Sequence, residues 1–182
     1  PIIEKEGYEA DDVIGTLAKK AEKEGFTTYM MTPDKDYAQL VSDQVFMYKP
    51  GKGGGDVEIW GLPEVQENFG IETADQVIDI LGLMGDSADN IPGCPGIGPK
   101  TAQKLIAEYG SIEELYKNTD KLKGKQKERI VENEEQVRLS KVLATIITDA
   151  PVPFDLDKLK KNELNKEELV KLLNELEFKT LI

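Results

Sequence analysis

The sequence predicts an α/β protein in two parts, a layer built on a parallel sheet and a helical region that follows it. Two observations support this prediction. Strand-like and helix-like segments alternate through the first 60 residues, which is the order expected of strands and helices in one layer. From Leu62 onward one helical pattern follows another, separated by turns that contain glycine or proline.

Apolar periodicity and turn residues predict the elements of the α/β part. Residues 9–24 place apolar side chains at helical spacing, and Gly25 follows as a helix terminator. FTTYMM at 26–31 is β-branched, aromatic and almost continuously apolar, as expected of a buried parallel strand. The other expected elements are strands at 1–5, 45–48 and 57–60, a short helix at 35–41, and a flexible loop, KPGKGGG, at 49–55.

The helical part is predicted from the same periodicity, with no strand signals between its elements. Pro151 and Pro153 make the stretch 146–162 mostly extended or loop. We place the change of pattern between residues 61 and 72, which gives domains of 1–70 and 71–182. The helices expected are 63–69, 73–84, 99–109, 111–117, 123–145 with a break, and 166–177.

Composition excludes several kinds of chemistry. The chain has 182 residues, no histidine and one cysteine, so a Ser-His-Asp triad and a histidine zinc site are impossible. Cys94 cannot form an internal disulfide, which favours a reducing, cytoplasmic location, and no apolar run approaches the roughly 18 residues of a membrane span. The net charge of −12 argues against nucleic acid as a partner. It does not decide the question, because local patches set binding.

Carboxylates gather in three short stretches, each located where a strand ends or a helix begins. In α/β sheets, ligands bind beyond the carboxyl ends of the strands, so we expect folding to bring these stretches into one pocket. Seven like charges there would repel one another strongly unless cations neutralised them, and Mg²⁺ and Mn²⁺ prefer carboxylate oxygens. The candidate metal ligands are Glu9, Asp11, Asp12, Asp34, Asp36, Asp86 and Asp89.

Each acidic stretch also has a simpler interpretation. Acids at 9–12 suit the partial positive charge of a helix N-terminus. Those at 34 and 36 follow a proline and suit a turn, and those at 86 and 89 suit turn capping. The metal-site interpretation is favoured because all three stretches lie at comparable places in the expected fold.

The segment NIPGCPGIGPKTAQKLIAEYGS at 90–111 is typical of a helix-hairpin-helix. Gly96 and Gly98 allow a tight turn, Ile97 is expected to pack between the flanking helices, and Pro99 suits a helix start. Such a turn offers free N–H groups to a phosphate and binds the DNA backbone without sequence preference. An ordinary helix-to-helix turn is the alternative. The candidate DNA-binding residues are Gly96, Ile97, Gly98, Lys100 and Thr101.

Two further basic features carry less weight. A cluster of cationic residues at 121–129 favours a solvated helix face over phosphate contacts. The loop KPGKGGG lacks the spacing and the following Ser or Thr of a phosphate-binding P-loop, so we interpret it as a mobile connection between strands.

Together these motifs resemble the 5′ nuclease (5′–3′ exonuclease) domain of bacterial DNA polymerase I, a member of the flap endonuclease superfamily. The resemblance covers nearly the whole chain. It implies an incomplete PIN-like or Rossmann-like parallel-sheet core over 1–70 and a helical H3TH DNA-binding subdomain over 71–182. The matching segments are GYEADDVIGTLAKKAEKEG, TPDKDYAQLV, LMGDSADNIPGCPGIGPKTAQKL and the closing LEFKTL.

The resemblance implies a metal-dependent enzyme that hydrolyses DNA or RNA-primer phosphodiesters near a single-strand/double-strand junction, in replication and repair. Its implied cofactors are two or more Mg²⁺ or Mn²⁺ ions at the seven carboxylates and a K⁺ ion at the hairpin. Its implied partners are DNA with a 5′ flap and the polymerase domains of the same parent chain, in the bacterial cytoplasm with the nucleoid. The catalytic residues that it implies are Asp12, Asp34, Asp36 and Asp86.

One departure from the family pattern affects the expected activity. The family begins with a strand carrying another metal-ligand Asp, followed by a second Asp and a basic helical arch, and none of these stands before Pro1. We therefore expect an N-terminally truncated fragment that has an exposed sheet edge and cleaves weakly or not at all when alone.

Two other functions stay open on the sequence. A non-catalytic helix-hairpin-helix module would bind duplex DNA without needing metal or acids. A phosphohydrolase that uses Asp34 and Asp36 on small phosphoesters would act without regard to DNA structure.

Overall fold

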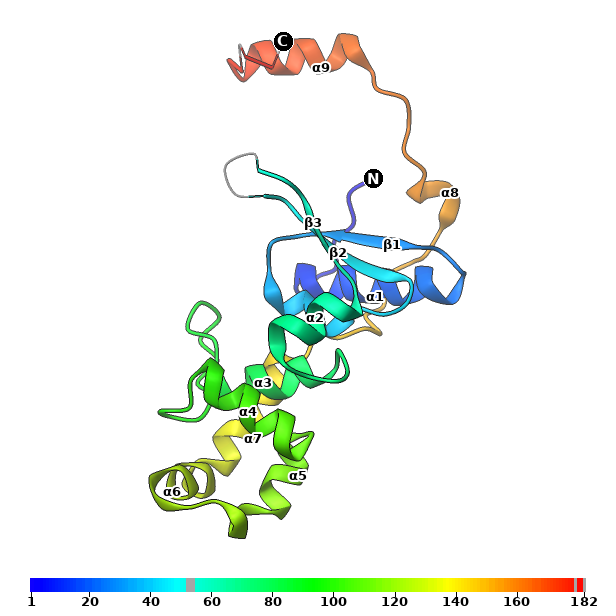
Figure 1. Cartoon of the computed structure of the whole chain (residues 1–182). Coiled ribbons are helices and arrows are strands. Elements are labelled where there is room, and N and C mark those ends of the chain that lie inside the picture. Colours follow the sequence, from blue (N-terminus) through cyan, green and yellow to red (C-terminus); the bar gives the residue numbers. More distant parts are fainter. Residues whose placement is uncertain (52–54, 179, 182) are drawn as a thin grey trace. The chain divides into compact units, whose positions relative to one another are not determined.

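The computed structural model describes residues 1–51, 55–178 and 180–181, and the chain divides into two compact units (Figure 1). One unit is Glu4–Val152, which contains all the candidate acids and the hairpin. The other combines Pro1–Ile3 with the C-terminal stretch that starts at Pro153. The expected KPGKGGG loop lies partly outside the described residues.

A three-stranded sheet in the order β1–β2–β3 forms the α/β layer, with β1 at Thr28–Met31, β2 at Val45–Lys49 and β3 at Glu58–Trp60. β1 and β2 pair in parallel, with Thr28 opposite Val45, whereas β3 runs antiparallel to β2. The α/β class is confirmed, but within the described sheet parallel pairing joins β1 and β2 and not β3. Residues 50–57 are too few for a parallel crossover, which needs about a dozen or more.

The strand predicted at residues 1–5 is absent from the described structure, where Pro1–Lys5 has neither strand nor helix geometry. A short apolar segment becomes a strand by pairing with a neighbour, so its propensity alone was insufficient. The prediction was wrong for this reason.

Helix α1 (Ala10–Lys23) packs against β1 and β2 and against a short 3₁₀ helix, η1 (Lys35–Leu40). The carboxylate of Asp12, in the first turn of α1, accepts a hydrogen bond from the backbone N–H of Glu9, so the two residues form a capping box. The helices predicted at 9–24 and 35–41 are therefore confirmed, the second as a 3₁₀ helix.

The helices predicted between residues 63 and 145 are also confirmed, including a break at Asn133. Helix α3 is at the centre and contacts η1, α4 and α7. Its buried Asp79 accepts a hydrogen bond from Ile112 N–H and pairs with Lys141 of α7 at 2.6 Å. The bounds are α2 Leu62–Phe69, α3 Gln76–Met84, α4 Pro99–Tyr109, α5 Ile112–Lys117, η3 Thr119–Lys121, α6 Gly124–Glu132 and α7 Glu134–Ala144.

One continuous hydrophobic core joins the sheet to the helices within Glu4–Val152. It runs from Met47 of β2 through Leu81 of α3 to Ile106 of α4 and Val137 of α7, all of which are buried. The α/β layer and the helices that follow it are therefore stabilised by the same apolar contacts.

After α7 the chain returns to the α/β layer as a non-helical stretch, residues 145–152, which we call the return segment. The hydroxyl of buried Thr16 in α1 donates to the Ile147 carbonyl at 3.3 Å and accepts from Ala150 N–H at 3.0 Å. The predicted loop is thus partly confirmed, but its first half is fixed by contacts with residues more than 130 positions earlier.

The unit that contains the C-terminal stretch has two helices, α8 (Leu156–Leu159) and α9 (Lys166–Glu175). The second confirms the helix predicted at 166–177, and the first interrupts the predicted loop. Asp155 caps α8 by accepting from the N–H groups of Asp157 and Lys158. In the described parts of the chain, every helix is too short or too polar to cross a bilayer.

Candidate active site

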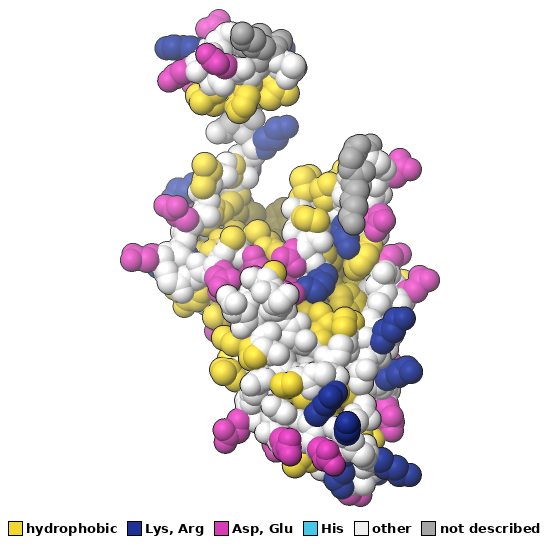
Figure 2. All heavy atoms as spheres, turned by 90° about the vertical axis from the view of Figure 1, so that its left-hand side faces the viewer, with side chains coloured by type: hydrophobic (Ala, Val, Ile, Leu, Met, Phe, Trp, Pro, Cys, Tyr) yellow, Lys and Arg dark blue, Asp and Glu magenta, His cyan; other side chains and the backbone are white. Residues whose placement is uncertain are grey.

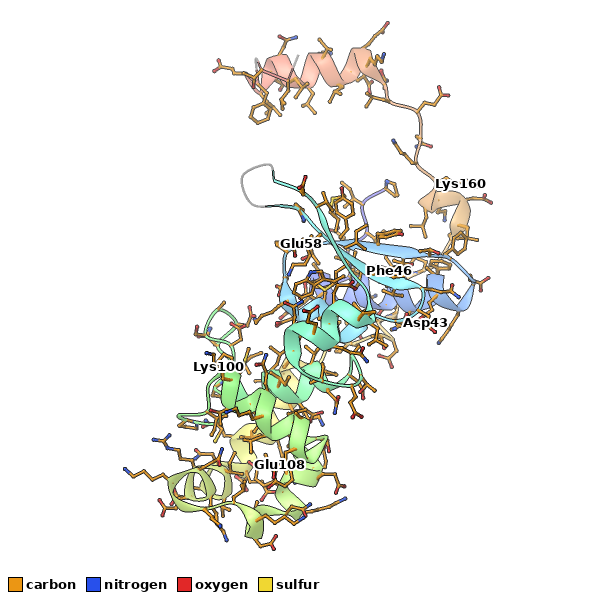
Figure 3. All side chains as sticks on the ribbon, in the orientation of Figure 1. Asp43, Phe46, Glu58, Lys100, Glu108 and Lys160 are labelled. Atoms are coloured by element: carbon orange, nitrogen blue, oxygen red, sulfur yellow. The ribbon has the colours of Figure 1, made fainter. Side chains whose placement is uncertain are left out.

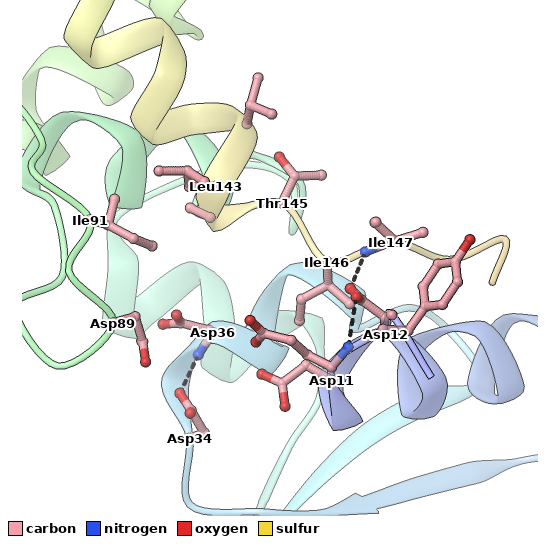
Figure 4. Close-up of a pocket in the computed structure, with 15 residues that line it drawn as sticks. Asp11, Asp12, Asp34, Asp36, Asp89, Ile91, Leu143, Thr145, Ile146 and Ile147 are labelled. Carbon is pink, nitrogen blue, oxygen red and sulfur yellow. Dashed lines mark hydrogen bonds between the residues drawn. The ribbon is translucent and has the colours of Figure 1, made fainter. Parts of the chain in front are cut away.

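An open pocket of about 850 Å³ lies where the start of α1, the start of η1 and the loop after α3 meet the end of α7 and the return segment (Figure 4). Six of the seven predicted acids line it. Its opposite wall is apolar, and Figure 2 shows acidic and hydrophobic side chains adjoining on one face of the molecule. The acidic wall is Glu9, Asp11, Asp12, Asp34, Asp36 and Asp89, and the apolar wall includes Ile91, Val142, Leu143, Ile146 and Ile147.

The seventh acid, Asp86, belongs to the same group. One carboxylate oxygen from each of Asp36, Asp86 and Asp89 lies within 4.8 Å of the other two. The backbone of Asp86 pairs with that of Ile91 through two hydrogen bonds, and its Oδ1 accepts from Ala88 N–H at 2.8 Å. A tight turn after α3 therefore presents both of its acids toward η1.

Asp36 is the innermost acid of this three-carboxylate cluster. Only 8% of its surface is exposed, and its buried Oδ1 lies 3.1 Å from the Lys35 ammonium. Burial raises the pKa of Asp36, although the nearby Lys35 opposes this effect. A buried carboxylate beside two more carboxylates fits the oxygen ligand set of a hard divalent cation.

The two acids from the second stretch take different positions. Asp34 precedes η1, and its Oδ1 accepts the N–H of Asp36 at 3.0 Å, so it caps this helix. It is exposed and faces the pocket (Figure 4). The turn interpretation and the pocket interpretation are therefore both compatible with Asp34, because one oxygen serves the cap and the other is left for a ligand.

The acids of α1 are held by distant partners. The hydroxyl of buried Tyr37 donates to Asp11 Oδ1 at 2.8 Å. Burial and the Asp11 carboxylate raise the pKa of Tyr37, so its phenol stays neutral and remains a donor. Asp12 accepts from Ile147 N–H at 2.8 Å and from Glu9 N–H at 3.2 Å, so both of its oxygens have backbone donors. Asp12 thus caps α1 and fastens the return segment while it faces the pocket.

Lys35 is a site residue that sequence reasoning missed. Its ammonium lies 3.1 Å from Asp36 Oδ1 and donates a short hydrogen bond to Asp86 Oδ2. Burial alone would lower the pKa of Lys35, but these two carboxylates outweigh it and raise the pKa, so the group stays charged. The same hydrogen bond lowers the pKa of Asp86. A lysine between two aspartates, as in Asp34-Lys35-Asp36, was the available signal.

Gln39 is a second missed residue, and it connects η1 to the end of α7. Its Nε2 donates to the carbonyls of Asp36 and Ala144 at 2.9 and 3.0 Å, and its Oε1 accepts from Ile146 N–H at 2.9 Å. The side chain is buried, so all three hydrogen bonds form away from water. Gln39 therefore fixes the acidic wall and the apolar wall of the pocket relative to each other.

We expect Gln39→Leu to lower the free energy of unfolding by about 2–4 kcal/mol, since it leaves three buried backbone groups without partners at about 1–3 kcal/mol for each strongly buried group. Urea unfolding monitored by circular dichroism measures this change. Gln103→Leu is the matched control, because Gln103 makes one exposed hydrogen bond to the Asn68 carbonyl. A loss for Gln39→Leu no larger than for the control would contradict the structural role.

The predicted hairpin lies between the loop after α3 and α4. Ile97 is buried, as predicted, and its N–H bonds to the Cys94 carbonyl at 3.0 Å. Gly98 is the N-cap of α4, and a Cβ built there meets no atom within 4 Å, so the turn faces open space. Lys100 is exposed in the first turn of the helix (Figure 3). The Gly96 carbonyl accepts a hydrogen bond from the Arg129 guanidinium at 3.2 Å.

Cationic side chains accompany this hairpin. Figure 2 shows several Lys and Arg side chains, mixed with acidic ones, at the height of α4–α6. Arg129 belongs to the cationic cluster at 121–129, and its backbone carbonyl also accepts from the buried Cys94 thiol at 3.5 Å. The cluster is therefore partly a solvated face, as predicted, and partly a support for the hairpin.

The fold and the pocket define a class of protein, in which an α/β layer with an acid-lined pocket precedes a helical region with a glycine-rich hairpin. Two family models match this chain. The N-terminal resolvase-like domain of 5′–3′ exonucleases matches residues 1–70, and their C-terminal SAM fold matches residues 72–167. The chain belongs to the 5′–3′ exonuclease family.

Curated relatives and solved structures agree with this assignment. DNA polymerase I of Bacillus subtilis is 46% identical over 180 residues, which are 98% of this chain and 20% of that polymerase. A zinc-bound T5 5′-exonuclease matches with a TM-score of 0.71 at 25% identity, covering 81% of this chain and 54% of the exonuclease. A complex of bacteriophage T5 flap endonuclease with DNA and metal ions matches with a TM-score of 0.66 at 25% identity, covering 78% and 51%. The chain thus spans about a fifth of its curated relative.

Proposed function

We propose that this chain is the 5′ nuclease part of a DNA polymerase I and that it hydrolyses phosphodiesters of DNA or RNA primers at 5′ flaps with divalent cations. The observation that carries this proposal is the cluster of Asp36, Asp86 and Asp89, in which one oxygen from each of the three carboxylates lies within 4.8 Å of the others and the Asp36 side chain is buried. Family membership supports the reaction class, and the T5 complex with DNA and metal ions supports the ligands.

In this proposal the acids divide between holding cations and shaping the pocket. Asp36, Asp86 and Asp89 would hold one Mg²⁺ or Mn²⁺ ion, and Asp34 with the acids of α1 would contribute to a second. A bound divalent cation supplies Lewis-acid stabilisation of the charge that develops on a phosphate oxygen. Asp12 would contribute through the lone pairs that its two backbone hydrogen bonds leave free, and it also holds the return segment in place. The catalytic set is Asp12, Asp34, Asp36 and Asp86.

The hairpin would hold the duplex beside this pocket. The N-terminus of α4 offers N–H groups to a phosphate, and the turn before it contains two glycines, which allow close approach of a DNA backbone. The set proposed for this contact is Gly96, Ile97, Gly98, Lys100 and Thr101. A K⁺ ion at the Gly96 carbonyl would share that oxygen with the Arg129 guanidinium. We propose that the chain divides into an α/β part at 1–70 and a helical DNA-binding part at 71–182, and that the helical part also supplies Asp86 and Asp89 to the cation site.

The test is cleavage of a labelled 5′-flap duplex by the polymerase that contains this chain. We expect cleavage with Mg²⁺ and none with EDTA, together with much weaker cleavage of a blunt duplex. Metal-independent DNA binding without cleavage would favour the duplex-binding module instead. Hydrolysis of a simple phosphomonoester with no response to DNA structure would favour the phosphohydrolase. We also propose that the polymerase domains of a longer parent chain are partners of this part. The proposed location is the bacterial cytoplasm, in association with the nucleoid.

Gly98→Val tests the hairpin separately from the acids. The added side chain meets open space, and Gly98 has an extended backbone that valine adopts, so we expect a stability change of no more than about 1 kcal/mol. The valine side chain would project into the space proposed for the phosphate backbone. We therefore expect flap-duplex binding to weaken at least about tenfold in a fluorescence anisotropy titration. Glu108→Val, on an exposed position of α4, is the matched control. Unchanged DNA affinity in Gly98→Val would remove the hairpin from the interface.

A further inference from the structure

The Lys35 ammonium lies within the proposed cation site itself. It is 3.1 Å from Asp36 Oδ1 and in hydrogen-bond contact with Asp86 Oδ2, and these residues supply two of the three converging carboxylates. Both acidic side chains are only 12% exposed, whereas the Lys35 side chain is 41% exposed. The acids are therefore held in place, and the lysine reaches them from the solvent side.

This arrangement places a monovalent cation where a divalent one would bind. An ammonium and a hard metal ion use the same carboxylate oxygens and share the same preference for negative charge. A lysine side chain has four flexible methylenes, so Lys35 can leave the pair without movement of the backbone. While it stays, the two carboxylates are partly neutralised, and the charge that would attract a metal ion is smaller.

We propose that Lys35 competes with the divalent cation for the oxygens of Asp36 and Asp86 and so lowers the affinity of the site for that cation. This inference rests on the proposed function, because it assumes that the three-carboxylate cluster is the cation site. A tethered ammonium has a high effective concentration at these oxygens. A divalent cation, with twice the charge, can displace it. Lys35 thus lowers the affinity of the site for cations.

The expected change in cation affinity depends on the fraction of time for which Lys35 leaves the carboxylate oxygens of Asp36 and Asp86 available. The apparent affinity for a ligand is reduced by the fraction of the protein that can bind it. If the ammonium occupies the oxygens about nine-tenths of the time, its removal tightens cation binding about tenfold.

Calorimetric titration of the 182-residue chain with Mn²⁺ tests the proposal. We expect Lys35→Met to bind Mn²⁺ at least about tenfold more tightly than the wild type and Lys35→Arg, which keeps the charge, to stay within about threefold of the wild type. Lys117→Met is the matched control, because it removes the same charge from an exposed pair with Glu114 in α5 and is expected to leave the affinity unchanged. Lys35→Gln repeats the test with a polar side chain if the methionine variant fails to fold.

The outcomes separate three cases. If Lys35 only stabilises the fold, its variants will have a lower melting temperature without metal and the same Mn²⁺ affinity as the wild type. That result would overturn this inference alone. Mn²⁺ binding that is absent from every variant, or that is unaffected by Asp86→Asn, would overturn the cation site of the proposed function together with this inference. Tighter binding in Lys35→Met and Lys35→Gln, lost again when Asp86→Asn is added, supports both.

Discussion

Replacing Asp36 and Asp86 together by asparagine is expected to reduce Mg²⁺-dependent flap cleavage at least about a hundredfold. Asparagine keeps the size of each side chain and removes both negative charges next to the buried Asp36 oxygen. Divalent cations supply several kcal/mol of transition-state stabilisation, and each 1.36 kcal/mol corresponds to a tenfold change in rate. Single-turnover cleavage of a labelled flap duplex by the polymerase proposed to contain this chain measures the effect.

The control for this experiment carries the same change of charge elsewhere. Asp43 and Asp120 are exposed and lie outside the pocket, so Asp43→Asn with Asp120→Asn is expected to leave cleavage within about threefold of the wild type. Circular dichroism should show that both double variants are folded. Substitution of Asp36 and Asp86 relieves repulsion among the acids but also removes both ion pairs of Lys35, so the melting temperatures of the two double variants are compared as well. Cleavage that survives in the Asp36 and Asp86 variant would refute the catalytic assignment.

Gly93→Ala is expected to lower the free energy of unfolding by about 3 kcal/mol or more. Gly93 has a positive φ of 60°, which costs an alanine about 1–2 kcal/mol. An added Cβ would also lie 2.6 Å from the carbonyl carbon of Met84 and 2.7 Å from Cα of Gly85, where backbone would have to move. Overpacking of this kind costs a further 1–3 kcal/mol or so. The expected shift in melting temperature is roughly 6–12 °C.

Gly70→Ala separates the two contributions. Gly70 ends α2 with a positive φ of 67°, but a Cβ there meets no atom within 4 Å. Its cost should be about 1–2 kcal/mol, from the backbone conformation alone. Differential scanning calorimetry of both variants gives the comparison. Equal losses for Gly93→Ala and Gly70→Ala would show that the close approach between the hairpin and the end of α3 tolerates a methyl group.

The sequence was sufficient to predict most helices because their apolar faces and terminators are local signals. Gly25, Pro99 and Gly110 each lie at a helix end, where the chain leaves or enters helical geometry. It was also sufficient to predict that the acids converge, because each acidic stretch lies at the end of an element. The orientation of β3 could have been inferred from its short connection to β2, and the strand at residues 1–5 could not be judged without knowledge of its partner.

The supporting residues could not be predicted, because their partners are far away in the sequence. Gln39 bonds to Ala144 and Ile146, and Thr16 to Ile147 and Ala150. Nothing in the local pattern around either residue indicates a partner more than 100 positions later. The same holds for Asp79. Its local sequence does not distinguish it from the other acids or indicate its buried ion pair with Lys141. Long-range polar contacts of this kind depend on the tertiary fold rather than on periodicity.

Because the apolar core is continuous from β2 to α7, the α/β part and the helical part should unfold together. The two matched family domains adjoin near residue 70, yet apolar side chains from both domains are buried in the same core. Amide protons of the strands and of α3 should therefore exchange in a single cooperative opening. A destabilising substitution in the helical part would then also unfold the acid-lined pocket, even where every carboxylate is unchanged.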